Sequence, residues 1–229
     1  FFFKQKTAYE IKECDWSSDV CSSDLWTFNF PKEFKTPLPA FGFVCSPLVD
    51  GEFVYVQAGA SFVCLDKQTG KVIWRSLKDD GGMWGSAFSS PIMANLAGRR
   101  QLLVQTREKL AGVEPTSGDV LWTQEIPAFR GMNILTPTPF ENSVFTSAYG
   151  GMSHLFTVRA STSEVTHSET WTNKARGYMS SPVVIDGHLY LHLQNQRFTC
   201  INLKTGESKW TTDRKSTRLN SSHIPLSRM

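Results

Sequence analysis

A repeat of about 45 residues is the feature that most limits what this chain can fold into. Four segments begin with Ser or Thr followed by a proline, at Pro47, Pro91, Pro137 and Pro182. Each segment ends with a tryptophan, at Trp74, Trp122, Trp171 and Trp210. Because two independent residues recur at one period, the pattern predicts repeated units that stack on their neighbours.

Each unit contains the signals of four short strands. In the first unit, Asp50-Gly51 separates two apolar runs, and a second turn ends in Gly70 just before Val72-Ile73-Trp74. Asp-Gly between β-branched and aromatic runs is a strong hairpin signal. Gly118 and Gly206 occupy the position of Gly70 in their own units, where a tight hairpin favours the positive φ that glycine adopts without strain.

Four antiparallel strands in each repeat predict an all-β protein, a β-propeller with about four blades. We expect the blades at about 40–77, 85–125, 131–173 and 177–212. The sixteen Gly, eleven Pro and 12% aromatic residues agree with a turn-rich β protein. A β-sandwich would not repeat a terminal tryptophan at this period, and WD40 blades would contain Gly-His and Trp-Asp pairs, which this sequence lacks.

The two ends of the chain differ from the repeats. One DNA element, read in opposite orientations, can encode both 15–25 and 213–222, and both segments resemble translated sequencing-library adapters. Such foreign segments are excluded from fold reasoning. We therefore expect 1–25 and 213–229 to be non-native, disordered tails and 26–212 to be the propeller.

Charge and hydropathy exclude two classes of partner. The formal net charge is +3, and the sequence contains no basic stripe of the kind that binds nucleic acid. No apolar run approaches the roughly 18 residues that a membrane-spanning helix needs. We expect neither nucleic-acid binding nor a membrane span.

The element from Asp66 through Thr69-Gly70 to Trp74 resembles the repeat of the pyrroloquinoline-quinone (PQQ)-type propellers. In that family this element closes a blade, and its tryptophan docks against the next blade. The third unit departs from the pattern, because 159–164 lacks a Thr-Gly turn. The resemblance implies a ring of seven or eight blades, of which this chain would supply half. It also implies that 26–39 is the outer strand of a preceding blade.

The resemblance does not by itself imply a bound quinone. Family dehydrogenases hold PQQ against a vicinal disulfide and a Ca²⁺ ion, whereas Cys45, Cys64 and Cys200 are far apart in this sequence. We expect these cysteines to be small buried strand residues. No catalytic or metal-ligating residue is assigned, and PQQ and Ca²⁺ are expected only if a full-length protein supplies their site.

The segments that enter the first strand of a blade are the candidate binding site. They place glycine beside bulky residues, and the ligand-binding candidates at the channel mouth are Trp84, Arg130, Arg176 and Tyr178. Arginine suits carboxylate or phosphate groups, and the aromatic rings suit a planar, sugar-like or peptide ligand. Alternatively, the glycines only permit a sharp turn and the aromatic rings pack on the next blade.

These observations predict a binding or scaffolding module rather than an enzyme. The resemblance implies a periplasmic or extracellular location and a protein or small-molecule ligand at the blade loops or channel mouth. The alternative is a fragment of a PQQ- and Ca²⁺-dependent quinoprotein dehydrogenase for alcohols or sugars. A third interpretation is a propeller domain fused to an enzyme.

Overall fold

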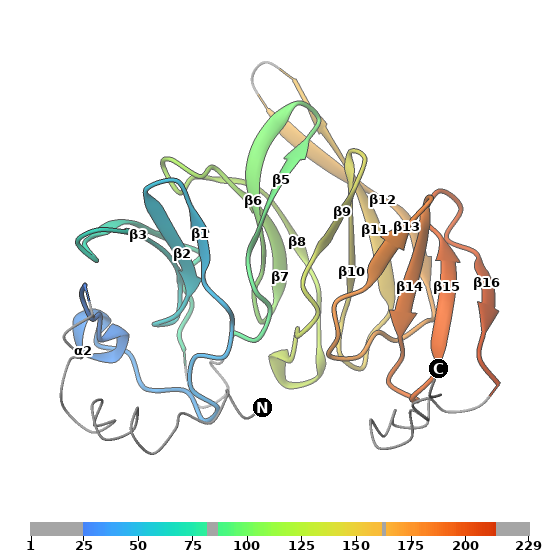
Figure 1. Ribbon diagram of the computed structural model, residues 1–229, viewed down its shortest axis with the longest axis horizontal. Coiled ribbons are helices and arrows are strands. Elements are labelled where there is room, and N and C mark those ends of the chain that lie inside the picture. Colours follow the sequence, from blue (N-terminus) through green and yellow to red (C-terminus); the bar gives the residue numbers. More distant parts are fainter. Residues whose placement is uncertain (1–24, 82–86, 162–163, 214–229) are drawn as a thin grey trace, which may run out of the picture.

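The computed structural model describes residues 25–81, 87–161 and 164–213. Within them the strands form four sheets, each of four strands in chain order. Figure 1 shows these sheets side by side, from the first at the left to the fourth at the right. The predicted all-β propeller blades are confirmed, whereas the tails expected at 1–25 and 213–229 lie outside the described residues except for Leu25 and Asp213. No helix in the described part of the chain is long and apolar enough to cross a membrane.

The four sheets, which we call blades one to four, have the following strands. Blade one consists of β1 (Leu48–Asp50), β2 (Phe53–Gln57), β3 (Phe62–Asp66) and β4 (Val72–Ser76). Blade two consists of β5 (Ile92–Leu96), β6 (Arg99–Gln105), β7 (Lys109–Val113) and β8 (Val120–Glu125). Blade three consists of β9 (Thr138–Phe140), β10 (Ser143–Ser147), β11 (Ser153–Ala160) and β12 (Val165–Asn173). Blade four consists of β13 (Val183–Ile185), β14 (His188–His192), β15 (Phe198–Asn202) and β16 (Ser208–Thr211). Two helical turns are α2 (Phe30–Phe34) and the 3-10 helix η1 (Phe129–Gly131).

The blades share one strand register. In blade one Tyr55 pairs with Cys64, which pairs with Trp74, and in blade four the same positions hold Tyr190, Cys200 and Trp210. In every blade the register between the third and fourth strands shifts next to the tryptophan pair. Such a bulge increases local twist and re-aims the side chains beside it.

The apolar core lies between blades rather than inside one of them. Tyr55, Phe62 and Trp74 of blade one pack against Leu102 and Val104 of blade two. Similar clusters join blades two and three and blades three and four. Each blade is therefore stabilised mainly by its neighbours, as in other repeat proteins.

Tryptophan and glycine form the boundary between blades one and two. Nε1 of Trp74 donates to the carbonyl oxygen of Pro115, 3.0 Å away, and its ring covers Gly118. A Cβ on Gly118 would lie 2.6 Å from that ring, and Gly118 has a φ of 78°. This position therefore needs glycine both for its backbone conformation and for the space that the indole occupies.

The boundary between blades three and four has the same construction. Nε1 of Trp171 donates to the carbonyl oxygen of Leu203, 2.7 Å away, and the ring covers Gly206.

Trp26 occupies the equivalent position against blade one. Its Nε1 donates to the carbonyl oxygen of Lys67, 2.8 Å away, and its ring covers Gly70. The outer strand expected at 26–39 is absent, because α2 lies within this segment, but Trp26 docks on blade one as a blade-closing tryptophan does. The helix is favoured by Pro31 in its first turn and by Asn29, whose side chain accepts a hydrogen bond from the backbone N–H of Lys32.

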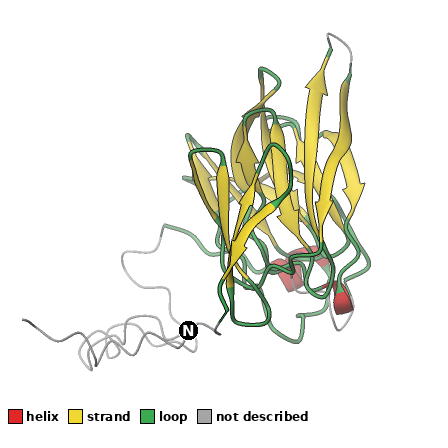
Figure 2. Ribbon diagram, turned by 90° about the vertical axis from the view of Figure 1, so that its right-hand side faces the viewer, coloured by secondary structure: helices red, strands yellow, loops and turns green. Residues whose placement is uncertain are grey.

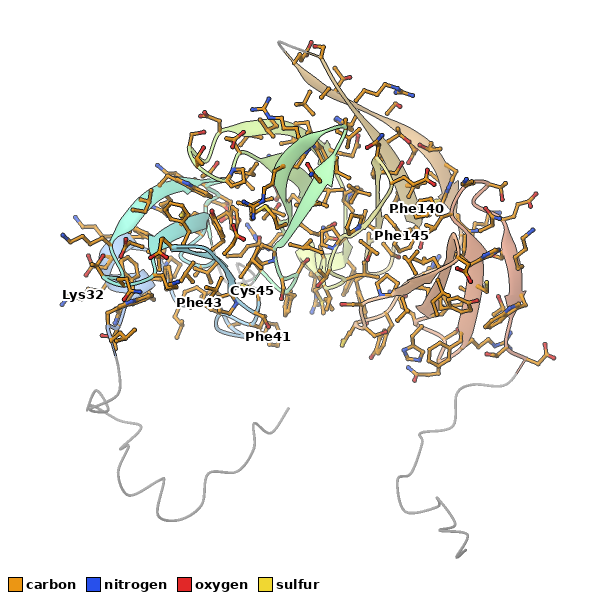
Figure 3. All side chains as sticks on the ribbon, turned by 45° about the horizontal axis from the view of Figure 1, so that its top comes forward. Lys32, Phe41, Phe43, Cys45, Phe140 and Phe145 are labelled. Carbon is orange, nitrogen blue, oxygen red and sulfur yellow. The ribbon has the colours of Figure 1, made fainter. Side chains whose placement is uncertain are left out.

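Aromatic residues of this N-terminal segment lie against blade one. The rings of Phe28, Phe30 and Phe34 contact one another, and the Arg75 guanidinium lies 4.0 Å from the centre of the Phe34 ring. Figure 3 shows Phe43 and Cys45 next to the first sheet, with Lys32 farther out.

The boundary between blades two and three is built differently. Nε1 of Trp122 donates to Oε1 of Gln101 in its own sheet, 2.7 Å away, and the indole leaves no space for a Cβ on Gly112. In place of the Gly turn, blade three has the long β11–β12 hairpin, which projects at the top of Figure 2. His167 of this hairpin covers the Trp122 ring, with ring centres 5.1 Å apart.

Candidate functional site

Three of the four candidate residues lie on one edge of the molecule, which we call the lower rim. This rim consists of the connections between blades and the turns between second and third strands, and it faces the bottom of Figure 1. Arg130 lies in the connection between blades two and three, and Arg176 and Tyr178 lie in the connection between blades three and four. Trp84 lies outside the described residues.

The connection that carries Arg130 is held in a defined shape. Arg130 and Gly131 have φ values of 53° and 67°, and the buried Asn133 amide donates to the carbonyl oxygens of Thr106, Arg107 and Ile126. This anchor presents η1 to solvent. Phe129 is 57% exposed, and the guanidinium carbon of Arg130 lies 5.1 Å from the centre of its ring.

Tyr178 belongs to a row of rings that crosses the rim. Its ring centre lies 6.4 Å from that of Tyr149 and 5.7 Å from that of His192. The backbone N–H of Phe129 donates to the carbonyl oxygen of Tyr149, 3.0 Å away, which ties η1 to this row. The structure therefore connects Arg130 and Tyr178 through Phe129 and Tyr149.

Arg176 lines a hollow at the far end of the row. The hollow has a volume of about 420 Å³, and its walls are Lys174, Ala175, Arg176, Leu193, Gln194 and Asn195. Backbone hydrogen bonds from Gln194 to Arg176 and from Tyr178 to His192, each 2.9 Å, hold the two walls together.

Gly177 fixes this segment onto blade three. Its N–H donates to Oγ of Ser147, 2.8 Å away, and a Cβ on Gly177 would lie 2.9 Å from the Ser147 side chain. The glycine in this entry segment thus permits a close approach to β10, while the adjacent Arg176 remains exposed and Tyr178 half-buried.

Sequence reasoning missed the residues that join the candidates. Phe129, Tyr149 and His192 were not selected, although they connect Arg130 with Tyr178 and with blade four. One signal was present: Tyr149-Gly150-Gly151-Met152 places glycine beside bulky residues, as the selected segments do. The contacts themselves cross blade boundaries and have no local sequence pattern.

The three cysteines of the described residues are buried free thiols; Cys64 and Cys200 lie in strands as predicted, whereas the prediction of a strand position is wrong for Cys45, which lies in a bend before β1. Cys45 donates to the carbonyl oxygen of Gln57, 3.2 Å away, and Cys64 and Cys200 occupy the same register position in blades one and four. Burial, followed by the negative charge of Asp66, raises the pKa of Cys64 to about 12. Burial also raises the pKa of Cys45. Among the described residues, no three His, Cys, Asp or Glu side chains are grouped as metal ligands.

Two kinds of comparison place the chain among known proteins. Residues 22–212 match a PQQ-type family model described as "Outer membrane protein assembly factor BamB". No curated protein gives a significant sequence match.

Among solved structures, BamB from Moraxella catarrhalis matches with a TM-score of 0.56 and 16% identity, over 75% of this chain and 48% of that chain. A quinohemoprotein alcohol dehydrogenase from Comamonas testosteroni matches with a TM-score of 0.51 and 16% identity, over 75% of this chain and 35% of that chain.

The chain spans half or less of the length of these two structures. At such low identity the structural matches show the propeller fold alone. The family model, in contrast, matches most of the chain, including all four blades. The chain belongs to the PQQ-type propeller family described as outer membrane protein assembly factor BamB.

Proposed function

We propose that this chain is a non-catalytic propeller that binds partner proteins at its lower rim, in the periplasm or outside the cell. The observation that carries the proposal is a group of aromatic, methionine and arginine side chains on that rim, of which Phe129, Met179, Arg130 and Arg176 are exposed and Tyr149 and Tyr178 are half-buried. Phe129 is 57% exposed and Met179 is 48% exposed, and Arg130 and Arg176 lie beside them. Aromatic residues, methionine and arginine are the residue types enriched in protein interfaces.

The rigidity of this rim also favours binding. Asn133 anchors one connection through three hydrogen bonds, and Gly177 anchors the next through Ser147. Side chains held on a fixed backbone lose less conformational entropy when a partner binds. The location is proposed from family membership.

The described residues do not fit the quinone cofactor found in some family members. Those dehydrogenases use a vicinal disulfide, whereas the cysteines here are separate buried thiols, and two of them lie three blades apart. The acidic residues of the described chain are not grouped with His or Cys as metal ligands. We therefore derive no redox step for this chain.

Selection from a random peptide library tests the proposal. We expect peptides selected on the immobilised chain to lose about tenfold or more in affinity for the triple variant Phe129→Ser, Arg130→Ser, Tyr178→Ser. A triple variant on the opposite rim, with Arg99, Arg100 and Lys204 changed to Ser, should retain affinity within about twofold. Peptide affinities that are unchanged by the lower-rim substitutions would overturn the proposal.

A second measurement separates binding from catalysis. Addition of PQQ and Ca²⁺ should leave the melting temperature unchanged and should give no dye-linked oxidation of alcohols or sugars. Stabilisation by the cofactor, or oxidation in its presence, would support the dehydrogenase interpretation and overturn a non-catalytic role.

A further inference from the structure

Blade four repeats the docking face of blade one. In blade one, four residues at fixed register positions pack toward blade two: Tyr55, Phe62, Cys64 and Trp74. The same register positions of blade four hold the same residue types: Tyr190, Phe198, Cys200 and Trp210. Because both the register and the residue types coincide, blade four has the kind of surface with which blade one packs on its neighbour.

This face of blade four is open in the single chain. Phe198 and Trp210 are 44% and 47% exposed, although their counterparts in blade one are buried. Val183 and Ile185 of β13, on the same side of the sheet, are 56% and 53% exposed. With on the order of 200 Å² in each of these four side chains, the face exposes about 400 Å² of apolar surface. An exposed apolar patch of this size marks an interaction site.

Blade one carries the complementary surface. At two boundaries inside the chain, a tryptophan donates to a backbone oxygen of the next blade and covers a glycine there: Trp74 covers Gly118, and Trp171 covers Gly206. Gly70 of blade one lies in the same kind of turn, with its N–H donating to the carbonyl oxygen four residues earlier, as in Gly118 and Gly206. Blade one therefore has the turn on which the blade-four tryptophan could dock.

The apolar positions around this turn also match. Leu102, Val104, Ala111 and Val113 of blade two receive blade one. The same register positions of blade one hold Val54, Val56, Val63 and Leu65. The chain thus contains both sides of one further blade boundary, at opposite ends of its row of blades (Figure 1).

The N-terminal segment occupies the blade-one surface, but it is held at the periphery. Trp26 donates to the carbonyl oxygen of Lys67 and covers Gly70, and the Phe34 ring lies over Gly59. No residue of 26–38 is buried, and α2 buries none of its side chains. A packed sheet would bury more apolar surface at this place than these partly exposed rings do, so it could displace them.

We propose that two copies of this chain associate head to tail, with blade four of each copy docked on blade one of the other and Trp210 in the place of Trp26. Two copies supply eight blades, and closed propellers have about four to eight. Head-to-tail contacts end at two copies when they close a ring. The two junctions have four faces of about 400 Å² each, roughly 1,600 Å² in total, which is the size of a standard stable interface.

The comparison with solved propellers agrees with a ring of two copies. One chain covers 48% of the BamB structure from Moraxella catarrhalis, so two copies have about the number of blades of that structure. The inference concerns self-association and goes beyond the proposed binding of partner proteins at the lower rim.

Sedimentation velocity of the full chain at about 1 to 100 μM tests this inference. Trp26→Ser should lower the dissociation constant of the dimer about tenfold or more, because it frees the Gly70 surface. Trp210→Ser should raise the dissociation constant about tenfold or more, because it removes the ring that docks there. A Trp26→Ser chain that stays monomeric, or a Trp210→Ser chain that dimerises like the wild type, would overturn the inference.

Two further variants serve as controls. Phe129→Ser removes a ring that is 57% exposed on the lower rim, and it should change the dissociation constant less than about twofold. An effect equal to that of Trp210→Ser would mean unspecific apolar association and would contradict the inference. Trp26→Phe keeps a ring over Gly70 but removes the hydrogen bond to Lys67, so it should tighten the dimer about threefold even if loss of the whole ring destabilises blade one.

A mixing experiment distinguishes head-to-tail docking from packing of two blade-four faces. In the Trp26→Ser background, Gly70→Ala fills the space under the docking indole, since a Cβ there would lie 2.6 Å from a ring placed as that of Trp26 is. Neither Gly70→Ala nor Trp210→Ser should dimerise alone, but a mixture of the two should form a heterodimer through its one intact junction. A Gly70→Ala chain that dimerises fully would show that blade four packs on blade four.

The size of the assembly gives the last outcome. The closed pair should be the largest species at every concentration. Species that grow beyond the dimer as concentration rises would rule out the two-copy ring.

Discussion

Two blade boundaries differ in how the tryptophan between the blades is hydrogen-bonded and covered. Between blades one and two, Trp74 crosses the boundary, donates to a backbone oxygen of the next blade and covers Gly118. Between blades two and three, Trp122 donates to Gln101 of its own blade and is covered by His167. The third blade has a long hairpin where the others have the Gly turn. This difference changes both the hydrogen-bond acceptor of the tryptophan and the residue that covers its ring.

The comparison shows that a buried indole requires both a hydrogen-bond acceptor and a complementary surface. Where the Gly turn supplies both, the tryptophan links two blades directly. Where that turn is missing, the acceptor is a buried side chain and the surface is an imidazole ring. The second arrangement depends on two side chains, so it is open to substitutions and pH changes that leave the first unaffected.

Removal of Trp74, which links blades one and two, should lower the free energy of unfolding the most. Trp74 is 9% exposed and Trp210, at the same register position in blade four, is 47% exposed. Trp74→Ala should lower the free energy of unfolding by about 3–5 kcal/mol, because it leaves a cavity between two blades. Trp210→Ala should cost less than about 1 kcal/mol. Denaturant titration checks both, and equal losses would contradict the docking role of Trp74.

A smaller loss of stability is expected when a methyl group is added to the glycine that the Trp74 ring covers. Gly118→Ala should cost about 2–3 kcal/mol, from its positive φ together with overlap with the Trp74 ring. Gly98→Ala is the matched control, because Gly98 has a similar φ of 74° but no atom within 4 Å of an added Cβ. Equal melting temperatures for the two variants would show that the indole contact contributes nothing.

The Gln101 side chain should contribute this stability only when Trp122 is present to donate a hydrogen bond to it. Gln101→Met should cost about 1–3 kcal/mol, because it leaves the buried Nε1 of Trp122 without an acceptor. In a Trp122→Phe background the same substitution should cost less, since that donor is already absent. A double-mutant cycle measures the difference, and additive losses would contradict the coupling.

Protonation of His167 should have the smallest effect. Burial lowers the pKa of His167 below its ordinary value of 6.5, so the folded state binds a proton less readily than the unfolded state. Its contribution to stability is therefore present above pH 6.5 and is lost as pH falls below that value. Denaturant titrations at a series of pH values across this range should show that the free energy of unfolding falls more steeply with falling pH for the wild type than for His167→Gln. Identical pH profiles would argue against the burial effect.

Much of the fold follows from residues that recur in the sequence. The tryptophan and proline periods and the Asp-Gly turns predicted the blades, because the same local geometry returns in each unit. The segment 26–39 was predicted as a strand and contains α2, because Asn29 and Pro31 favour helix locally and the family pattern does not account for them.

The binding rim was predicted only in part. Arg130, Arg176 and Tyr178 share a glycine-rich pattern, whereas Tyr149, His192 and Gln194 join them through contacts that depend on how the blades stack. Spatial neighbours of this kind are not encoded at any fixed spacing. The structure was needed to place them together.

Methionine methyl NMR tests the central claim, that the lower rim of blades three and four binds a partner, most directly. Met152 and Met179 are 38% and 48% exposed on this rim, and Met93 packs between blades one and two. On addition of a peptide selected on the immobilised chain, the methyl signals of Met152 and Met179 should shift while that of Met93 stays in place. A bound peptide that leaves the signals of Met152 and Met179 unmoved would contradict the account.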